Sequence, residues 1–137
     1  MDNFTIVRNE HLNHHGYLFG GTLLRWVDEF SWLVASRDYP GCTLVTVAMN
    51  DIQFRHRVNN GAILRFNIDW VGQGRTSVRY RVVVYADEPG ATSEKEVFVT
   101  EVTFVRVDDK GTKQPLPEVK FLPSRYGYGG PDDGRTQ

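Results

Sequence analysis

The sequence predicts one α+β domain in which a curved antiparallel sheet of about five strands wraps a single long helix. One stretch carries apolar residues at helical spacing, and four long runs rich in β-branched and aromatic residues follow it. Short joins rich in turn residues favour antiparallel pairing of these runs. At 137 residues the chain is long enough to bury a core of its own.

The composition narrows the class of function. A net charge of −1 provides no strong positive field, which argues against nucleic-acid binding. Cys42 is the only cysteine in the sequence, so no disulfide forms within the chain and a reducing, cytoplasmic compartment is expected. The first residues lack a signal pattern, and no apolar run approaches the length that spans a membrane.

The amino-terminal part holds a short β-rich run at residues 4–8, a polar loop, and then the long helix, expected over residues 20–38. Apolar residues recur there at the spacing of one helix face: Leu23, Val27, Phe30 and Val34. Other apolar side chains lie around the remaining faces, so we expect other structure to cover the helix on all sides. Proline and glycine end the helix at residues 38–41.

Four long strands are expected after the helix, over residues 44–56, 62–71, 75–87 and 95–108. Alternation is clear in the second of them, where Leu64, Phe66 and Ile68 share one face. The domain is expected to cover residues 1–122. Residues 123–137 are rich in glycine and are expected to form a flexible tail.

The loop and the helix start carry a spaced motif of five residues: Asn13, Gly16, Gly20, Gly21 and Asp28. This motif resembles that of the hot-dog-fold acyl-CoA thioesterases of the YciA and cytosolic acyl-CoA hydrolase type, in which an acid follows the second glycine by seven positions. The strand start Gly74-Arg75-Thr76-Ser77 is similar as well, and the resemblance covers about residues 11–117. It implies a hot-dog fold, hydrolysis of a thioester to a free acid and CoA, and a site shared across a homodimer.

Asp28 is the candidate catalytic carboxylate, which would act as general base on water or as nucleophile. Gly20 and Gly21 at the helix start offer unpaired backbone N–H groups as an oxyanion hole. Asn13 would position the water or the thioester. The structural alternatives are a tight loop at the two glycines and an ion pair between Asp28 and Arg25.

The spacing of these groups predicts a dimer. Gly21 and Asp28 are seven residues apart, about 10 Å along the helix axis, whereas both must lie about 3 Å from one reacting carbonyl. Two antiparallel helices of a two-fold dimer satisfy both requirements. A tetramer or hexamer built from such dimers stays open.

CoA carries phosphate groups that arginine recognises well. The candidate substrate-binding residues are Gly16, Arg57, Arg75, Thr76 and Ser77. Arg75, beside glycines at a strand start, is the first phosphate candidate, and His56 is either a polar strand residue or a phosphate contact. No metal is expected at His11, His14 and His15, which no cysteine or acidic cluster accompanies. No cofactor is expected other than CoA as part of the substrate.

The chain departs from the family pattern directly after the acid. Glu29-Phe30-Ser31-Trp32 is bulkier than the family's small residues, so we expect short to medium-length or aromatic acyl groups. An alternative function is a non-catalytic acyl-CoA-binding sensor or assembly module on the same fold, although such a module needs no attacking acid. A hydratase is disfavoured because the helix contains no histidine.

Overall fold

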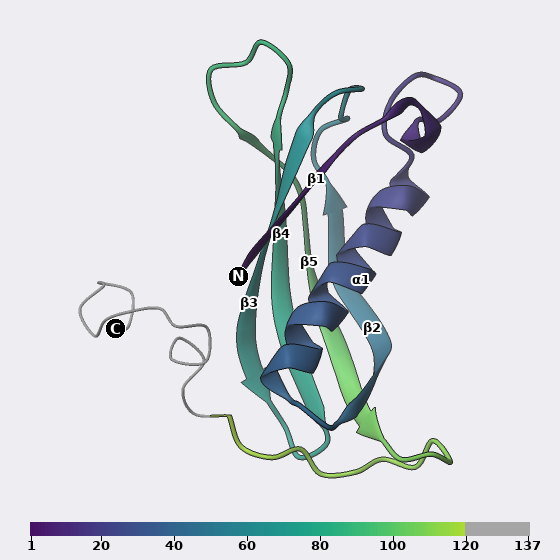
Figure 1. Cartoon of the computed structure of the whole chain (residues 1–137), viewed down its shortest axis with the longest axis vertical. Coiled ribbons are helices and arrows are strands. Elements are labelled where there is room, and N and C mark those ends of the chain that lie inside the picture. Colours follow the sequence, from purple (N-terminus) through teal and green to yellow (C-terminus); the bar gives the residue numbers. More distant parts are fainter. Residues whose placement is uncertain (120–137) are drawn as a thin grey trace, which may run out of the picture.

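The computed structural model describes residues 1–119, which form one long helix and a five-stranded antiparallel sheet (Figure 1). The elements follow in the order β1 (Asp2–Ile6), the 3₁₀ helix η1 (Asn9–His11), α1 (Gly20–Asp38), β2 (Thr43–Phe54), β3 (Ile63–Gln73), β4 (Ser77–Asp87) and β5 (Lys95–Val107). The sheet order β1-β3-β4-β5-β2 makes β1 and β2 its edge strands. This arrangement confirms the predicted α+β class.

The bounds of the elements agree well with the sequence-based expectation. The helix covers the predicted residues 20–38, and each of the four long strands begins and ends within two residues of its predicted bounds. β1 lies two residues earlier than predicted, because its backbone pairs with β3 from Asp2 to Ile6. The predicted domain boundary at residue 122 and the predicted flexible tail lie outside the described residues.

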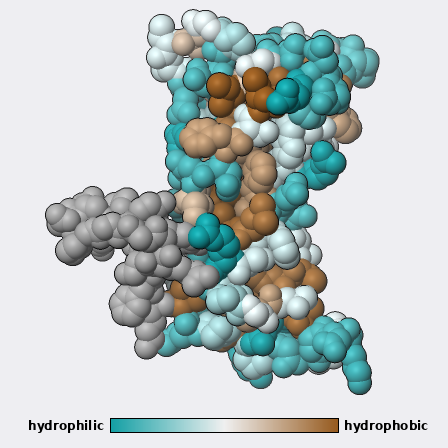
Figure 2. All heavy atoms as spheres, in the orientation of Figure 1, coloured by the Kyte–Doolittle hydropathy of each residue, from teal (hydrophilic) through white to brown (hydrophobic). Residues whose placement is uncertain are grey.

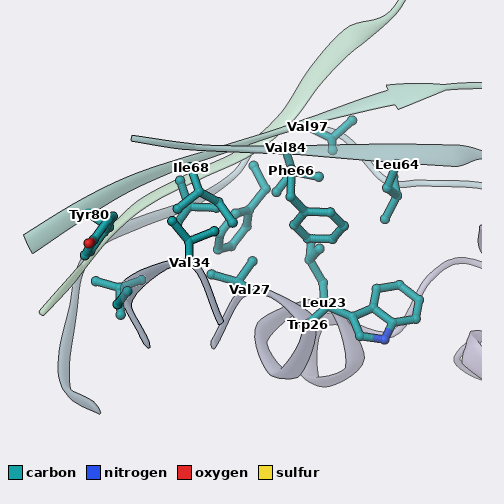
Figure 3. Close-up of a cluster of buried hydrophobic side chains, with 14 of the residues drawn as sticks. Leu23, Trp26, Val27, Val34, Leu64, Phe66, Ile68, Tyr80, Val84 and Val97 are labelled. Carbon is teal, nitrogen blue, oxygen red and sulfur yellow. The ribbon is translucent and has the colours of Figure 1, made fainter. Parts of the chain in front are cut away.

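One face of α1 packs against the sheet and forms the core. Leu23, Val27 and Val34 are buried in one cluster with Phe66 of β3 (Figure 3). Phe30 joins this cluster through an edge-to-face contact with Phe66, with the ring centroids 4.9 Å apart. The four helix positions that were predicted to share a face therefore do so, and their burial holds the helix on the sheet.

The opposite face of α1 stays open, which differs from the expectation that other structure covers the helix on all sides. Leu33 is 45% exposed there, and Trp32, at the side of the helix next to β2, is 40% exposed. The space-filling view from the helix side shows hydrophobic groups at the surface among hydrophilic ones (Figure 2). A single sheet contacts only one side of a helix, so this apolar surface is left uncovered within residues 1–119. No helix in this part of the chain is long and apolar enough to span a membrane.

The carboxyl end of α1 is tied to β3 and β4 by buried polar groups. The Tyr80 hydroxyl donates to Oδ2 of Asp38 at 2.5 Å. The Tyr39 hydroxyl donates to Oε1 of Gln73 at 2.7 Å and accepts from the indole N–H of Trp70 at 3.0 Å. Burial raises the pKa of the Tyr39 phenol. These bonds fix the orientation of the helix relative to the sheet.

Candidate active site

Asn13 organises the loop that leads into α1. Its Oδ1 accepts hydrogen bonds from the backbone N–H groups of His15 at 2.9 Å and of Tyr17 at 3.2 Å. Gly16 completes the turn with a φ of 86°, a conformation that glycine adopts without strain. Asn13 was expected to position water or substrate, but its carbonyl oxygen is used by the loop. Its amide nitrogen makes no hydrogen bond within residues 1–119 and is the group that it offers to a ligand.

The loop is fixed to the segment that follows β2. The Leu18 N–H donates to the carbonyl of Val58 at 2.9 Å, and Tyr17 forms a backbone bridge with Asn59. The guanidinium carbon of Arg57 lies 4.6 Å from the centroid of the Tyr17 ring, a cation–π contact. These contacts bring Arg57, a predicted substrate-binding residue, next to the start of α1.

The amino end of α1 presents two backbone N–H groups without partners. The carbonyl of Phe19 accepts the third and fourth N–H groups of the helix, whereas those of Gly20 and Gly21 donate to no acceptor within residues 1–119. A Cβ on Gly21 would lie 2.7 Å from the Phe19 ring, but a Cβ on Gly20 would only touch Phe54 at 3.5 Å. A side chain at position 21 would therefore require the exposed Phe19 ring to move, whereas at position 20 the bare backbone leaves room for a ligand.

Asp28 is half-buried in the middle of α1, and its Oδ1 accepts a hydrogen bond from the hydroxyl of Thr46 at 2.6 Å. Thr46 lies on β2, so the carboxylate points toward the line of contact between α1 and this edge strand. The alternative ion pair with Arg25 is absent among the ion pairs of residues 1–119. Sequence reasoning missed Thr46, because a residue 18 positions away approaches Asp28 only through the packing of β2 on α1.

A pocket of about 340 Å³ opens beside the amino end of α1. Its lining includes Asn13, Gly20, Phe54, Arg55, His56 and Arg57. Arg55 also donates to Glu96 and Gln53, so part of its charge is already paired. The two arginines suit the pocket to an anionic ligand, and His56 lies in its wall. Asp28 does not line this pocket.

The other predicted substrate-binding residues lie elsewhere. Arg75, Thr76 and Ser77 belong to the β3–β4 connection and the start of β4, at the opposite end of the sheet from the start of α1 (Figure 1). The 11 residues of β4 correspond to about 36 Å of strand. One chain therefore does not bring these three residues and Arg57 to the same small ligand.

The histidines of the loop make contacts within the fold. Nδ1 of His11 accepts the N–H of Arg8 at 2.9 Å, and the ring lies edge-on to Trp26 at a centroid distance of 4.7 Å. The rings of His14 and His15 lie 3.9 Å apart. Among residues 1–119, no group of three or more His, Cys, Asp or Glu side chains is placed to hold a metal ion.

Comparisons with known proteins give the chain a family. The profile of the thioesterase superfamily matches residues 15–93, more than half of the chain. The Bacillus subtilis protein YkhA, named an uncharacterized acyl-CoA thioester hydrolase, is 31% identical over 110 residues, which cover 78% of this chain and 62% of the relative. The cytosolic acyl coenzyme A thioester hydrolase of Mus musculus is 24% identical over 107 residues, 77% of this chain and 28% of the relative. The chain thus spans less than two thirds of the length of these relatives.

A solved structure agrees with both the family and the fold. A hexameric hot-dog-fold thioesterase of Campylobacter jejuni superposes with a TM-score of 0.76 at 29% identity, covering 92% of this chain and 95% of that one. The predicted hot-dog fold is therefore confirmed, with α1 as its central helix. The chain belongs to the thioesterase superfamily.

Proposed function

We propose that the protein is an acyl-CoA thioesterase, which hydrolyses a thioester to a free acid and CoA. The observation that carries this proposal is that one helix holds both groups that the reaction needs. These are the Thr46-bonded carboxylate of Asp28 and the unpartnered N–H groups of Gly20 and Gly21. The activities named for the Bacillus subtilis and Mus musculus relatives support the same assignment.

Asp28 acts either as general base or as nucleophile. As a base, it takes a proton from water while the water oxygen attacks the carbonyl carbon. The C–S bond then breaks, and the proton passes to the leaving sulfur. As a nucleophile, Asp28 attacks the carbonyl itself and CoA leaves, after which water hydrolyses the mixed anhydride and restores the carboxylate. In both routes the carbonyl oxygen becomes negative, and the N–H groups of Gly20 and Gly21 stabilise it. One such donor typically lowers the activation free energy by on the order of 3 kcal/mol.

Two chains complete the site. Gly21 and Asp28 are separated by about 10 Å along one helix axis, and the pocket beside Gly20 does not include Asp28. In a two-fold dimer with antiparallel helices, the amino end of α1 in one chain faces Asp28 of the other. The edge strand β2 exposes apolar side chains that support association along it: Val45, Val47, Ile52 and Phe54. The hexameric assembly named for the Campylobacter jejuni relative supports self-association of this chain.

The pocket receives the thioester end of the substrate beside Gly20, where the free amide nitrogen of Asn13 donates to it. Arg57 and His56 lie in the wall of the same pocket and contact the polar thiol arm that leads to the phosphates. Arg75 lies too far away in its own chain, so it contacts the same ligand only from a neighbouring chain. The name of the Mus musculus relative supports a cytosolic location.

The experiment replaces the proposed attacking group. Asp28→Asn keeps the shape of the side chain, and we expect at least about a hundredfold loss of kcat, measured as free thiol released from a panel of acyl-CoA substrates. Circular dichroism and size-exclusion chromatography should show an unchanged fold and assembly. Glu29→Gln is the matched control, because it neutralises the adjacent exposed carboxylate.

Near-normal turnover by Asp28→Asn would contradict the role of this residue. Acyl-CoA binding without any turnover by the unmodified protein would instead favour the binding module.

A further inference from the structure

We propose that Trp32 limits the length of the acyl group, an inference that rests on the proposed function of Asp28. Trp32 follows Asp28 by four residues, so the two side chains lie on the same face of α1, about 6 Å apart along its axis. A thioester whose carbonyl carbon lies at the Asp28 carboxylate therefore has the indole within reach of its acyl group.

Both side chains are anchored to β2. The hydroxyl of Thr46 donates to Asp28 at 2.6 Å, and the indole N–H of Trp32 donates to the carbonyl of Leu44 at 3.0 Å. Leu44 and Thr46 are two residues apart on the strand, about 7 Å, which matches the spacing of their helix partners. We call these four residues the α1–β2 seam. Its hydrogen bonds hold the indole in place beside the carboxylate.

The other residues directly after the acid do not reach the seam. Phe30 packs edge to face on a β3 phenylalanine at 4.9 Å, and Ser31 is buried with its hydroxyl donating to a helix carbonyl at 2.7 Å. Glu29 is exposed and about 100° further round the helix than Asp28. Of the four residues 29–32 that were expected to limit the acyl group, only Trp32 therefore lies beside Asp28 at the seam. Trp32 is 40% exposed.

The indole suits the acyl group and not the thiol arm of the substrate. Its N–H is already bonded to Leu44, so the exposed part of the ring is apolar. The thiol arm of acyl-CoA carries amides and phosphates, for which Arg55, His56 and Arg57 provide polar contacts in the pocket. A short alkyl group gains by contact with the ring, whereas a longer one collides with a side chain that its hydrogen bond keeps in position.

The test compares kcat/KM for straight-chain substrates from acetyl-CoA to dodecanoyl-CoA in the unmodified protein, in Trp32→Ala and in Trp32→Phe. We expect the ratio of dodecanoyl-CoA to acetyl-CoA to rise at least about tenfold in Trp32→Ala, with Trp32→Phe between the two. A ratio measured within one preparation does not depend on the fraction of folded protein, so lost stability does not change it. Phe4→Ala is the matched control, because Phe4 is a 62% exposed aromatic on β1, at the opposite edge of the sheet.

Each remaining outcome counts against the inference. An unchanged ratio in both Trp32 variants overturns it and leaves the proposed function intact. An equal loss for every chain length also overturns it, because the indole would then contact the thiol arm that all substrates share. If the unmodified protein cleaves no substrate of the series, the proposed function fails, and this inference fails with it.

Discussion

The hydroxyl of Thr46 on β2 donates a 2.6 Å hydrogen bond to Oδ1 of Asp28 in the middle of α1. The second carboxylate oxygen of Asp28 makes no hydrogen bond within residues 1–119. The bond therefore fixes the orientation of the carboxylate and leaves one oxygen available to take a proton from water or to attack a carbonyl. A positioned carboxylate with one free oxygen is what either proposed route requires.

Removing the Thr46 hydroxyl should slow turnover without unfolding the protein. In Thr46→Val the shape of the side chain is kept, and the carboxylate loses its partner. We expect kcat to fall about tenfold to a hundredfold, since a hydrogen bond to a charged group contributes about 1.5–3 kcal/mol. Steady-state kinetics with one acyl-CoA substrate measures this change in kcat. Thr46→Ser should recover most of the rate, and a Thr46→Val enzyme at full kcat would show that the bond is only structural.

A charge on the exposed edge of β2 should separate the chains. Val47 is 55% exposed and is the extra residue where the pairing of β2 with β5 shifts register between Thr46 and Ala48. In Val47→Asp we expect a monomer by light scattering, because a carboxylate is costly to bury in an apolar interface. Turnover should be lost together with the dimer while circular dichroism stays unchanged. A fully active monomer would refute the shared site.

Ionisation of Tyr39 should lower the stability of the fold at alkaline pH. Burial raises the pKa of its phenol above the ordinary value of 10.0, so the fold favours the protonated form. This contribution is complete below pH 10 and is lost as the pH rises through the higher pKa of the folded state. Tyr39→Phe should cost about 1–3 kcal/mol at neutral pH, because Trp70 and Gln73 lose their partner.

Urea unfolding at neutral pH and at about pH 11 measures both effects for this variant. Between these pH values the Phe variant should lose less stability than the unmodified protein. Equal losses would exclude Tyr39 as the titrating group.

The fold was predictable wherever local pattern determines it. The bounds of α1 followed from the helical spacing of its apolar residues, with glycines at its start and proline after its end. The four long strands followed from runs of β-branched residues that lie between turn residues. The irregularities of β2 were not predictable. Its register against β5 shifts again between Asn50 and Gln53, and Asp51 adopts a φ of 54°. Such shifts depend on the partner strand, and the sequence of β2 itself reads as one regular strand.

The proposed site is readable from the sequence where it lies on one continuous segment. The motif shared with the thioesterase family singled out Gly20, Gly21 and Asp28, and the seven-residue separation of Gly21 and Asp28 led to the prediction that one helix does not bring the two groups to one carbonyl. The roles proposed for Thr46 and Trp32 depend on contacts between α1 and β2, which no local pattern encodes. Arg75 was grouped with the other binding residues because of its chemistry, but the length of the β3–β4 hairpin places it at the opposite end of the sheet from the start of α1 (Figure 1).

The shared site is tested most directly by mixing two inactive variants. Asp28→Asn lacks the acid, and Gly20→Leu blocks the approach of substrate to the helix start, where within residues 1–119 only Phe54 lies near a Cβ. After the two are refolded together at equal amounts, half of the dimers are mixed, and each mixed dimer contains one intact site. We predict a recovery of about one quarter of the unmodified activity. A mixture that stays as inactive as its components would contradict a site built from two chains.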